Sequence, residues 1–322
     1  MTQPEAVATK TREASAGGPS GRRRVLRFAG LSLLLTVAMV VADVIALGLG
    51  NRVQALSPHY YMALGDSLSF GYQPNLDFSA GFADVIFNDL HKTGVSALVN
   101  YACAGETTQT MIDGGCVGRF AHKGSYLGPQ LQAAVDFLSK AKNRGRVSPI
   151  TLEIGANDVL PDWDAAACSA DPAATVDLAT MDANLTHVIF PALVKALGPA
   201  SGDLHLLNYY NPFARACPES APFIDLVNSH LKADAGPFRI SVIDVYNAFG
   251  GDTGTAKNIC DLTWYCSVYH DIHPTNDGYK IIARTVENAL GLPGAKLRLG
   301  YGAPVGAMAP RIAAVWRRTP LG

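Results

Sequence analysis

Residues 59–71 read HYYMALGDSLSFG, an apolar run that leads into a serine flanked by two glycines. The run over His59–Leu64 is aromatic-rich and ends at a turn former, which predicts a buried β-strand. The two glycines allow the chain to turn sharply on both sides of Ser67. The turn would place the Ser67 hydroxyl at the end of the strand. It is not the G-x-S-x-G elbow, because Ser69 stands where the second glycine belongs.

Short apolar runs alternate with longer helical segments along the rest of the chain. Strands are expected at five places: His59–Leu64, Leu98–Ala102, Ile150–Ile154, Leu204–Tyr209 and Ile240–Val245. Helices are expected at Gly81–His91, Pro129–Asn143, Val176–Leu197, Ala221–Ala235 and Asn276–Leu290. Strands that alternate with helices predict βαβ crossovers. We therefore expect one α/β domain over residues 59–290, with a parallel sheet of about five strands covered on both faces.

Polar groups follow three of the expected strands and precede the last helix. In a parallel sheet, ligands bind beyond the carboxyl ends of the strands. Ser67 follows the first strand, Gly105 the second and Asn157 the third, and His273 lies in the loop before the last helix. They supply a nucleophile, a backbone N–H donor, an amide donor and a base. Each motif alone is a weak signal, because turns and loop histidines are common, but the four together in this order are specific.

The four blocks together resemble those of the GDSL/SGNH hydrolase superfamily. They read GDSLSFG at 65–71, NYACAGETT at 100–108, GANDV at 155–159 and DIHPTNDGY at 271–279. The six cysteines and the CAGETT motif further resemble secreted, disulfide-bonded esterases and lipases of actinobacterial type. The resemblance covers residues 65–280, and it implies a three-layer α/β/α flavodoxin-like fold that acts on esters.

The resemblance also implies a role for each matching residue. Ser67 would be the nucleophile and His273 the base. The backbone N–H groups of Ser67 and Gly105 and the side-chain amide of Asn157 would form the oxyanion hole. A serine hydroxyl is a weak nucleophile until a base within reach removes its proton, and the oxyanion needs preorganised donors. No cofactor and no metal are expected.

The acidic member of the site departs from the family pattern. That residue usually lies three positions before the histidine, where this chain has His270, whereas Asp271 lies two positions before it. Asp271 is our tentative third catalytic residue. A backbone carbonyl or another carboxylate could take its place, because the role needs only an acceptor for Nδ1–H of His273. Asp66, beside the nucleophile, is expected to hold the turn instead.

The N-terminal 55 residues have the layout of an export or anchor segment. A basic region over residues 1–27 is followed by an apolar segment over residues 28–55. This layout is typical of a signal peptide or a transmembrane anchor, and the arginines at 22–24 resemble a twin-arginine export signal. Cleaved signal, uncleaved anchor and buried core helix all remain open, although Asp43 weakens the anchor interpretation. The first two would make the domain secreted or membrane-anchored, outside the cytoplasm in either case.

Six cysteines follow the apolar segment. An even number in an exported domain predicts three disulfides. The entropy of loop closure favours near neighbours, which gives the pairs Cys103–Cys116, Cys168–Cys217 and Cys260–Cys266. Cys260, Cys266, His270 and His273 also resemble a string of zinc ligands. The spacing fits no common zinc finger, and an oxidising compartment favours the disulfide.

Composition and charge exclude other classes of protein. Among 322 residues, 48% are hydrophobic and 16% are charged, which excludes a disordered chain and a coiled coil. Residues 51–322 carry 20 basic and 24 acidic side chains, so nucleic acid is not an expected partner. Residues 291–322 carry five basic residues and no acidic one, and we expect them to form a loosely ordered tail.

The sequence therefore predicts an exported serine esterase or lipase that is a monomer and acts on a small-molecule, lipid or glycan ester. A glycan O-acetyl esterase or a phospholipase of the same fold remains open, because acyl-chain preference depends on the shapes of loops. A catalytically silent binding module is the alternative from another class. The displaced acid is its support, whereas every group needed for covalent chemistry is present.

Overall fold

The computed structural model describes residues 58–116, 122–251 and 256–296. The basic region and apolar segment predicted over residues 1–55 lie outside these ranges, as does the predicted tail beyond residue 296. Within the described ranges no helix is both long enough and apolar enough to cross a membrane. The signal or anchor, the domain bounds and the tail therefore stay predictions.

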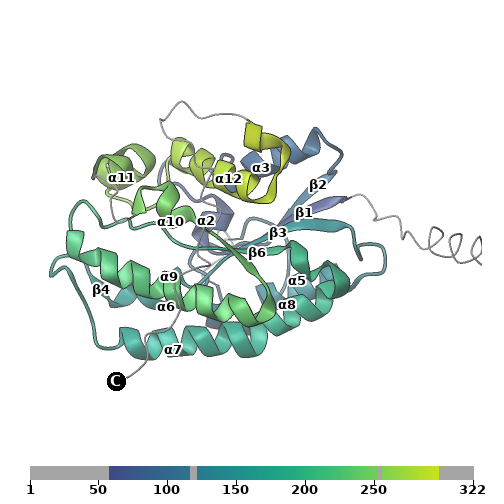
Figure 1. Cartoon of the computed structure of the whole chain (residues 1–322), viewed down its shortest axis with the longest axis horizontal. Helices are drawn as coiled ribbons and strands as arrows, with labels where there is room; N and C mark the ends of the chain where they lie inside the picture. Colours follow the sequence, from purple (N-terminus) through teal and green to yellow (C-terminus); the bar gives the residue numbers. More distant parts are fainter. Residues whose placement is uncertain (1–57, 117–121, 252–255, 297–322) are drawn as a thin grey trace, which may run out of the picture. The chain divides into compact units, whose positions relative to one another are not determined.

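A five-stranded parallel sheet lies at the centre of the domain (Figure 1). All its strand pairs are parallel, in the order β2-β1-β3-β6-β7. Counted along the chain within this sheet, the order is 2-1-3-4-5, as in flavodoxin-like folds. The predicted fold class is confirmed. The strands are β1 (Tyr60–Gly65), β2 (Ala97–Asn100), β3 (Val147–Glu153), β6 (Leu204–Leu207) and β7 (Ser241–Ile243).

Helices cover both faces of the sheet, which gives three layers. On one face, above the sheet in Figure 1, α3 (Phe82–His91) packs against α12 (Asn276–Leu290). On the other face lie α5 (Gln130–Ser139), α7 (Ala174–Asn184), α8 (Phe190–Leu197) and α9 (Ala221–Ala235). Because both faces are covered, β1 and β3 are buried along almost their whole length, as a parallel sheet requires.

The observed bounds of α9 and α12 are the predicted ones. For α12, residues at both ends of the helix mark where it starts and stops. The hydroxyl oxygen of Thr275 accepts a hydrogen bond from the Gly278 N–H (3.3 Å) at its start. Gly291 closes the helix in the left-handed conformation (φ 64°). Both are common signals of helix ends. By contrast, α5 ends at Ser139 instead of the predicted Asn143, since Lys140 adopts an extended conformation (ψ 130°).

The single helix predicted over Val176–Leu197 is instead three consecutive elements. α7 ends at Asn184, a π-helical turn covers Leu185–Ile189, and α8 completes the run. Pro191 has no N–H to bond the carbonyl of His187, as a continuous α-helix would require. The regular α-helical ladder is therefore interrupted at this point.

Several short elements were not predicted from sequence, because they are too short for hydrophobic periodicity to register. The helical turns α2, α4 and α6 follow β1, β2 and β3 at the carboxyl end of the sheet, where the candidate site lies. Besides several 3-10 turns, the unpredicted elements are α2 (Ser67–Phe70), α4 (Thr108–Asp113), α6 (Ala156–Val159), α10 (Val245–Ala248), α11 (Ala256–Leu262) and the antiparallel pair β4 (Trp163–Asp164) and β5 (Ser169–Ala170).

Three disulfides cross-link the chain outside the central sheet. They link Cys103 to Cys116, Cys168 to Cys217 and Cys260 to Cys266, the near-neighbour pairs that loop-closure entropy favours. Because Cys260 and Cys266 are bonded to each other and His273 contacts Ser67, the zinc-ligand string of the sequence does not assemble.

Candidate active site

Ser67 is the first residue of α2, directly after β1. The Asp66 carboxylate caps this turn by accepting a hydrogen bond from the Leu68 N–H (2.9 Å), as expected for a residue that holds the turn. Gly65 has a φ of 123°, and a Cβ at this position would lie 1.7 Å from the carbonyl oxygen of Glu153. The close approach of β3 therefore requires glycine before the serine. The local sequence thus fixes the position of Ser67 at the end of β1.

His273 reaches Ser67 from the loop that precedes α12. Its Nε2 lies 2.8 Å from Ser67 Oγ. The loop is held by a hydrogen bond from the Trp264 N–H to the carbonyl oxygen of His273 (2.9 Å). The ring of Tyr72 packs against the imidazole with 4.6 Å between ring centroids. Tyr72 therefore limits the positions that the imidazole ring can take.

Asp271 contacts the imidazole at Nδ1, the ring nitrogen that does not face Ser67. Its Oδ1 accepts hydrogen bonds from Nδ1 (2.7 Å) and from the backbone N–H of His273 (2.8 Å). Of the three acceptors that the sequence left open, the Asp271 carboxylate is the one that contacts Nδ1, whereas His270 is exposed. Burial raises the pKa of Asp271, but the hydrogen bonds and charge of His273 outweigh this effect, so its pKa lies below the ordinary value. An ionised Asp271 keeps the proton on Nδ1 and leaves Nε2 free to accept the Ser67 proton.

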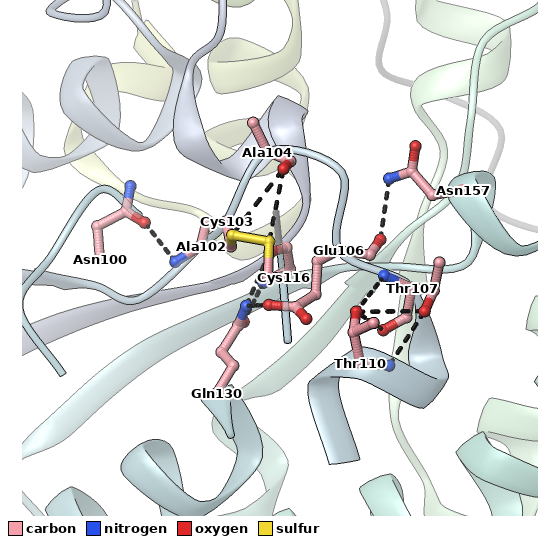
Figure 2. Close-up of a disulfide and its surroundings, with 11 residues drawn as sticks. Asn100, Ala102, Cys103, Ala104, Glu106, Thr107, Thr110, Cys116, Gln130 and Asn157 are labelled. Atoms are coloured by element: carbon pink, nitrogen blue, oxygen red, sulfur yellow. Dashed lines mark hydrogen bonds between the residues drawn. A yellow bond between two sulfur atoms is a disulfide. The ribbon is translucent and has the colours of Figure 1, made fainter. Parts of the chain in front are cut away.

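Gly105 and Asn157 lie beyond β2 and β3 and line the same pocket as Ser67. Gly105 has a φ of 87° in a loop tied down by the Cys103–Cys116 disulfide. The Asn157 side chain donates a hydrogen bond to the carbonyl oxygen of Glu106 (2.9 Å), which joins the two turns (Figure 2). An amide nitrogen carries two hydrogens, so Asn157 has a second N–H for a ligand. The structure thus brings the five predicted catalytic and oxyanion-hole residues to one pocket.

Buried polar side chains that were not predicted from sequence support these turns. Gln130 donates to Glu106 Oε2 (2.7 Å) and to the Gly65 carbonyl (3.0 Å), and its own oxygen accepts from the Gly65 N–H (2.6 Å). It therefore ties the end of β1 to the Gly105 loop, as Figure 2 shows in part. Asp158 accepts from the N–H and hydroxyl of Thr108, and burial raises its pKa to about 6. Gln130 carries no signal in the sequence, whereas Asp158 is part of the GANDV block.

The pocket in front of Ser67 has a volume of about 290 Å³. Tyr209 and Tyr210 line it, whereas Phe213 is buried against Trp163, with 5.8 Å between ring centroids. Apart from the groups around Ser67 its wall is mostly apolar. The apolar residues include Leu68, Val159, Leu160, Pro212, Ile224 and Val227.

Solved structures with similar folds include several lipolytic enzymes. A member of the lipolytic G-D-S-L family from Veillonella parvula is 20% identical, with 72% of this chain and 98% of that chain covered and a TM-score of 0.43. A lipase from a goat rumen metagenome is 20% identical, with coverages of 71% and 96% and a TM-score of 0.49. The acetylxylan esterase Axe2 of Geobacillus stearothermophilus is 17% identical, with coverages of 74% and 97% and a TM-score of 0.47.

Among curated proteins, none matches this chain. A family model does match, and it extends over residues 63–281, about two-thirds of the chain. These residues include β1 with its serine turn, the Gly105 and Asn157 turns and the His273 loop. The chain belongs to the GDSL-like lipase/acylhydrolase family.

Proposed function

We propose that this protein is a serine esterase that hydrolyses carboxylic esters through an acyl-serine intermediate on Ser67. The observation that carries the proposal is the chain of two short hydrogen bonds from Ser67 Oγ to His273 Nε2 (2.8 Å) and from His273 Nδ1 to Asp271 Oδ1 (2.7 Å). The Ser67 end of this chain lines the pocket. Nucleophile, base and orienting acid stand in the order that acyl transfer needs.

The first half of the reaction forms the acyl-enzyme. Ser67 Oγ attacks the carbonyl carbon of the ester while His273 Nε2 takes the hydroxyl proton. The carbonyl oxygen becomes an oxyanion, which accepts hydrogen bonds from the N–H groups of Ser67 and Gly105 and from the Asn157 amide. The bond to the alkoxy group then breaks, and His273 returns the proton to the leaving alcohol.

The second half releases the acid. His273 takes a proton from water, the resulting hydroxide adds to the acyl carbon, and the same donors stabilise the second oxyanion. Collapse breaks the bond to Ser67 Oγ, which recovers its proton from His273. Asp271 stays ionised throughout and stabilises the imidazolium that forms twice in each cycle.

The shape of the pocket favours an apolar acyl group over acetyl. Ile224 and Val227 on α9 contribute apolar side chains to a cavity of about 290 Å³, several times the volume of a water molecule (about 30 Å³). Each methylene that moves from water into such a pocket gains about 0.8 kcal/mol, which corresponds to roughly fourfold in kcat/KM. We therefore propose a medium-chain ester as the preferred substrate.

A chain-length series on p-nitrophenyl esters tests both the activity and the pocket. For the wild type we expect kcat/KM to rise from acetate through butyrate to octanoate. Val227→Trp fills the pocket from α9, so we expect octanoate turnover to fall more than tenfold and acetate turnover to change little. Leu226→Trp is the control, because Leu226 is the preceding residue and is 46% exposed. A wild-type profile that peaks at acetate would contradict the acyl pocket, and no hydrolysis of any ester would contradict the esterase.

We propose that the domain works outside the cytoplasm. Three disulfides among the described residues support this, because disulfides persist in oxidising compartments. The basic and apolar N-terminal segments of the sequence agree with export. If the proposal holds, thiol alkylation of the chain in its native cells labels none of the six cysteines until a reductant is added. Free thiols before reduction would indicate a reducing compartment.

A further inference from the structure

Two fully buried carboxyl groups lie side by side behind Ser67. Asp66 follows β1 and Glu153 ends β3, and each is only 1% exposed. The two strands are neighbours, and the Asp66 N–H donates to the carbonyl oxygen of Glu153 (3.0 Å). Burial raises the pKa of each of the two carboxyl groups. Two buried carboxyl groups so close together are not both ionised, so one of them keeps its proton.

The other contacts of the pair show which carboxyl group carries the proton. Asp66 accepts hydrogen bonds from the Leu68 N–H (2.9 Å) and the Tyr209 hydroxyl (3.2 Å), which favour its ionised form. Neither oxygen of Glu153 has an N–H or O–H donor at normal hydrogen-bond distance within the described ranges. A fully buried carboxylate with no donor and no cation would cost several kcal/mol. Burial and the Asp66 charge accordingly raise the pKa of Glu153 well above its ordinary value.

Tyr209 extends the pair to the other side of the site. Its hydroxyl donates to Asp66 Oδ2 (3.2 Å) and accepts a hydrogen bond from the Ala156 N–H (3.0 Å). Ala156 directly precedes Asn157 at the start of α6. The hydroxyl therefore bridges the turn that presents Ser67 and the turn that presents the Asn157 amide.

We propose that Glu153 is a protonated carboxylic acid that donates its proton to Asp66, and that this pair and Tyr209 together hold the Ser67 and Asn157 turns at the separation that the oxyanion needs. All three are positioning residues. With one shared proton the pair carries a single negative charge, whereas two charges behind Ser67 would oppose the developing oxyanion. The positioning role of these residues rests on the esterase activity proposed above, whereas the protonation of Glu153 does not depend on that activity.

Other titratable groups also act on the pair and define how it responds to pH. The charge of His273 favours ionised Asp66. The remaining groups are acids and phenols whose own pKa values are raised, so a second negative charge on the pair would be unfavourable among them. These groups are Glu106, Asp158, Tyr209, Tyr210 and Tyr279.

Glu153→Gln tests the proton without reference to activity. Glutamine offers an N–H to Asp66 and does not titrate. Above about pH 5, Glu153 of the unfolded wild type has lost its proton, whereas the folded protein keeps it. Wild-type stability therefore falls as pH rises towards the raised pKa of the folded state. From denaturant unfolding of the full-length chain with intact disulfides, we expect the ratio of unfolding constants, wild type over variant, to rise about tenfold per pH unit between pH 5.5 and 7.5. A flat ratio would overturn the protonated Glu153.

Kinetics on p-nitrophenyl butyrate test the positioning. Tyr209→Phe removes the bridge between Asp66 and Ala156, and we expect kcat to fall about 10–100-fold with KM within twofold, because misplaced oxyanion donors act in the transition state. Glu153→Leu has no donor for Asp66, so we expect a larger loss of kcat than for Glu153→Gln. Equal kcat in these two variants, or an unchanged kcat in Tyr209→Phe, would overturn the positioning role. If Glu153→Leu does not fold, the tyrosine variant still decides.

Discussion

Replacing Ser67 with alanine is expected to lower kcat for ester hydrolysis by at least about 10⁴-fold. Removal of a catalytic serine from a serine hydrolase abolishes the acyl-enzyme route and leaves only what the oxyanion hole and substrate binding supply. The Ser67 hydroxyl is the group that contacts His273 Nε2 (2.8 Å), so its loss leaves the base without a nucleophile to activate. KM is expected to change little, because the β-carbon of residue 67 and the pocket remain.

The measurement is steady-state hydrolysis of p-nitrophenyl butyrate together with labelling by a fluorophosphonate. The wild type should take up one label on Ser67, and the Ser67→Ala variant none. Ser79→Ala is a matched control, because Ser79 is an exposed serine whose hydroxyl bonds to Asp77 (2.7 Å) outside the pocket. Equal turnover in Ser67→Ala and the wild type would remove the serine from the mechanism. An unlabelled wild type that hydrolyses no ester would favour a silent binding module.

Local sequence signals were sufficient to predict most of the fold. The run over His59–Leu64 predicted a buried strand, because apolar residues suit a sheet covered on both faces, and β1 is buried along almost its whole length. Thr275 and Gly291 marked both ends of α12 through their own side-chain and backbone preferences. The π-helical turn before α8 could not be derived in the same way, because Pro191 shows where a ladder is interrupted but not how the chain continues.

The candidate site was predictable where function depends on a single residue type. Ser67, Gly105, Asn157 and His273 each have a chemical reason to stand in a short, specific motif. Glu153 lies within the predicted strand Ile150–Ile154, but its proposed protonation depends on Asp66, which follows the neighbouring strand β1. Contacts between strands decide such properties, and one strand's sequence does not contain them.

The sequence left open which group orients His273, because Asp271 lies two residues before the histidine and the acid of the family pattern lies three residues before it. Two features of the loop explain how Asp271 reaches the imidazole. His270 has a left-handed backbone (φ 48°), which turns the chain just before Asp271. The Asp271 carboxylate then accepts the backbone N–H of His273 two residues on (2.8 Å), an Asx turn. The same turn brings Oδ1 to within 2.7 Å of Nδ1, so a spacing of two residues suffices.

Asp271→Asn is the second substitution with a large expected effect, a loss of about 10²–10⁴-fold in kcat. An asparagine can present its N–H to Nδ1, which moves the imidazole proton to Nε2, and Nε2 can then no longer accept the Ser67 proton. The loss should fall on kcat with little change in KM, because the tautomer matters for proton transfer and not for binding. Asp277→Asn is the control, since Asp277 lies on the exposed start of α12 with its side chain 67% accessible.

The pH dependence of stability tests whether Asp271 is ionised in the folded protein, because the asparagine of Asp271→Asn has a similar shape but does not titrate. Because contacts with His273 lower the pKa of Asp271 in the folded protein, its carboxylate stabilises the wild type above the ordinary aspartate pKa of about 4, and this contribution is lost as pH falls through the lowered value. The difference in unfolding free energy between the wild type and Asp271→Asn should therefore be largest near neutral pH and shrink in acid.

The kinetic result has its own contrary outcome. If Asp271→Asn keeps most of the wild-type kcat, the imidazole needs no carboxylate, and Ser67 and His273 act as a dyad.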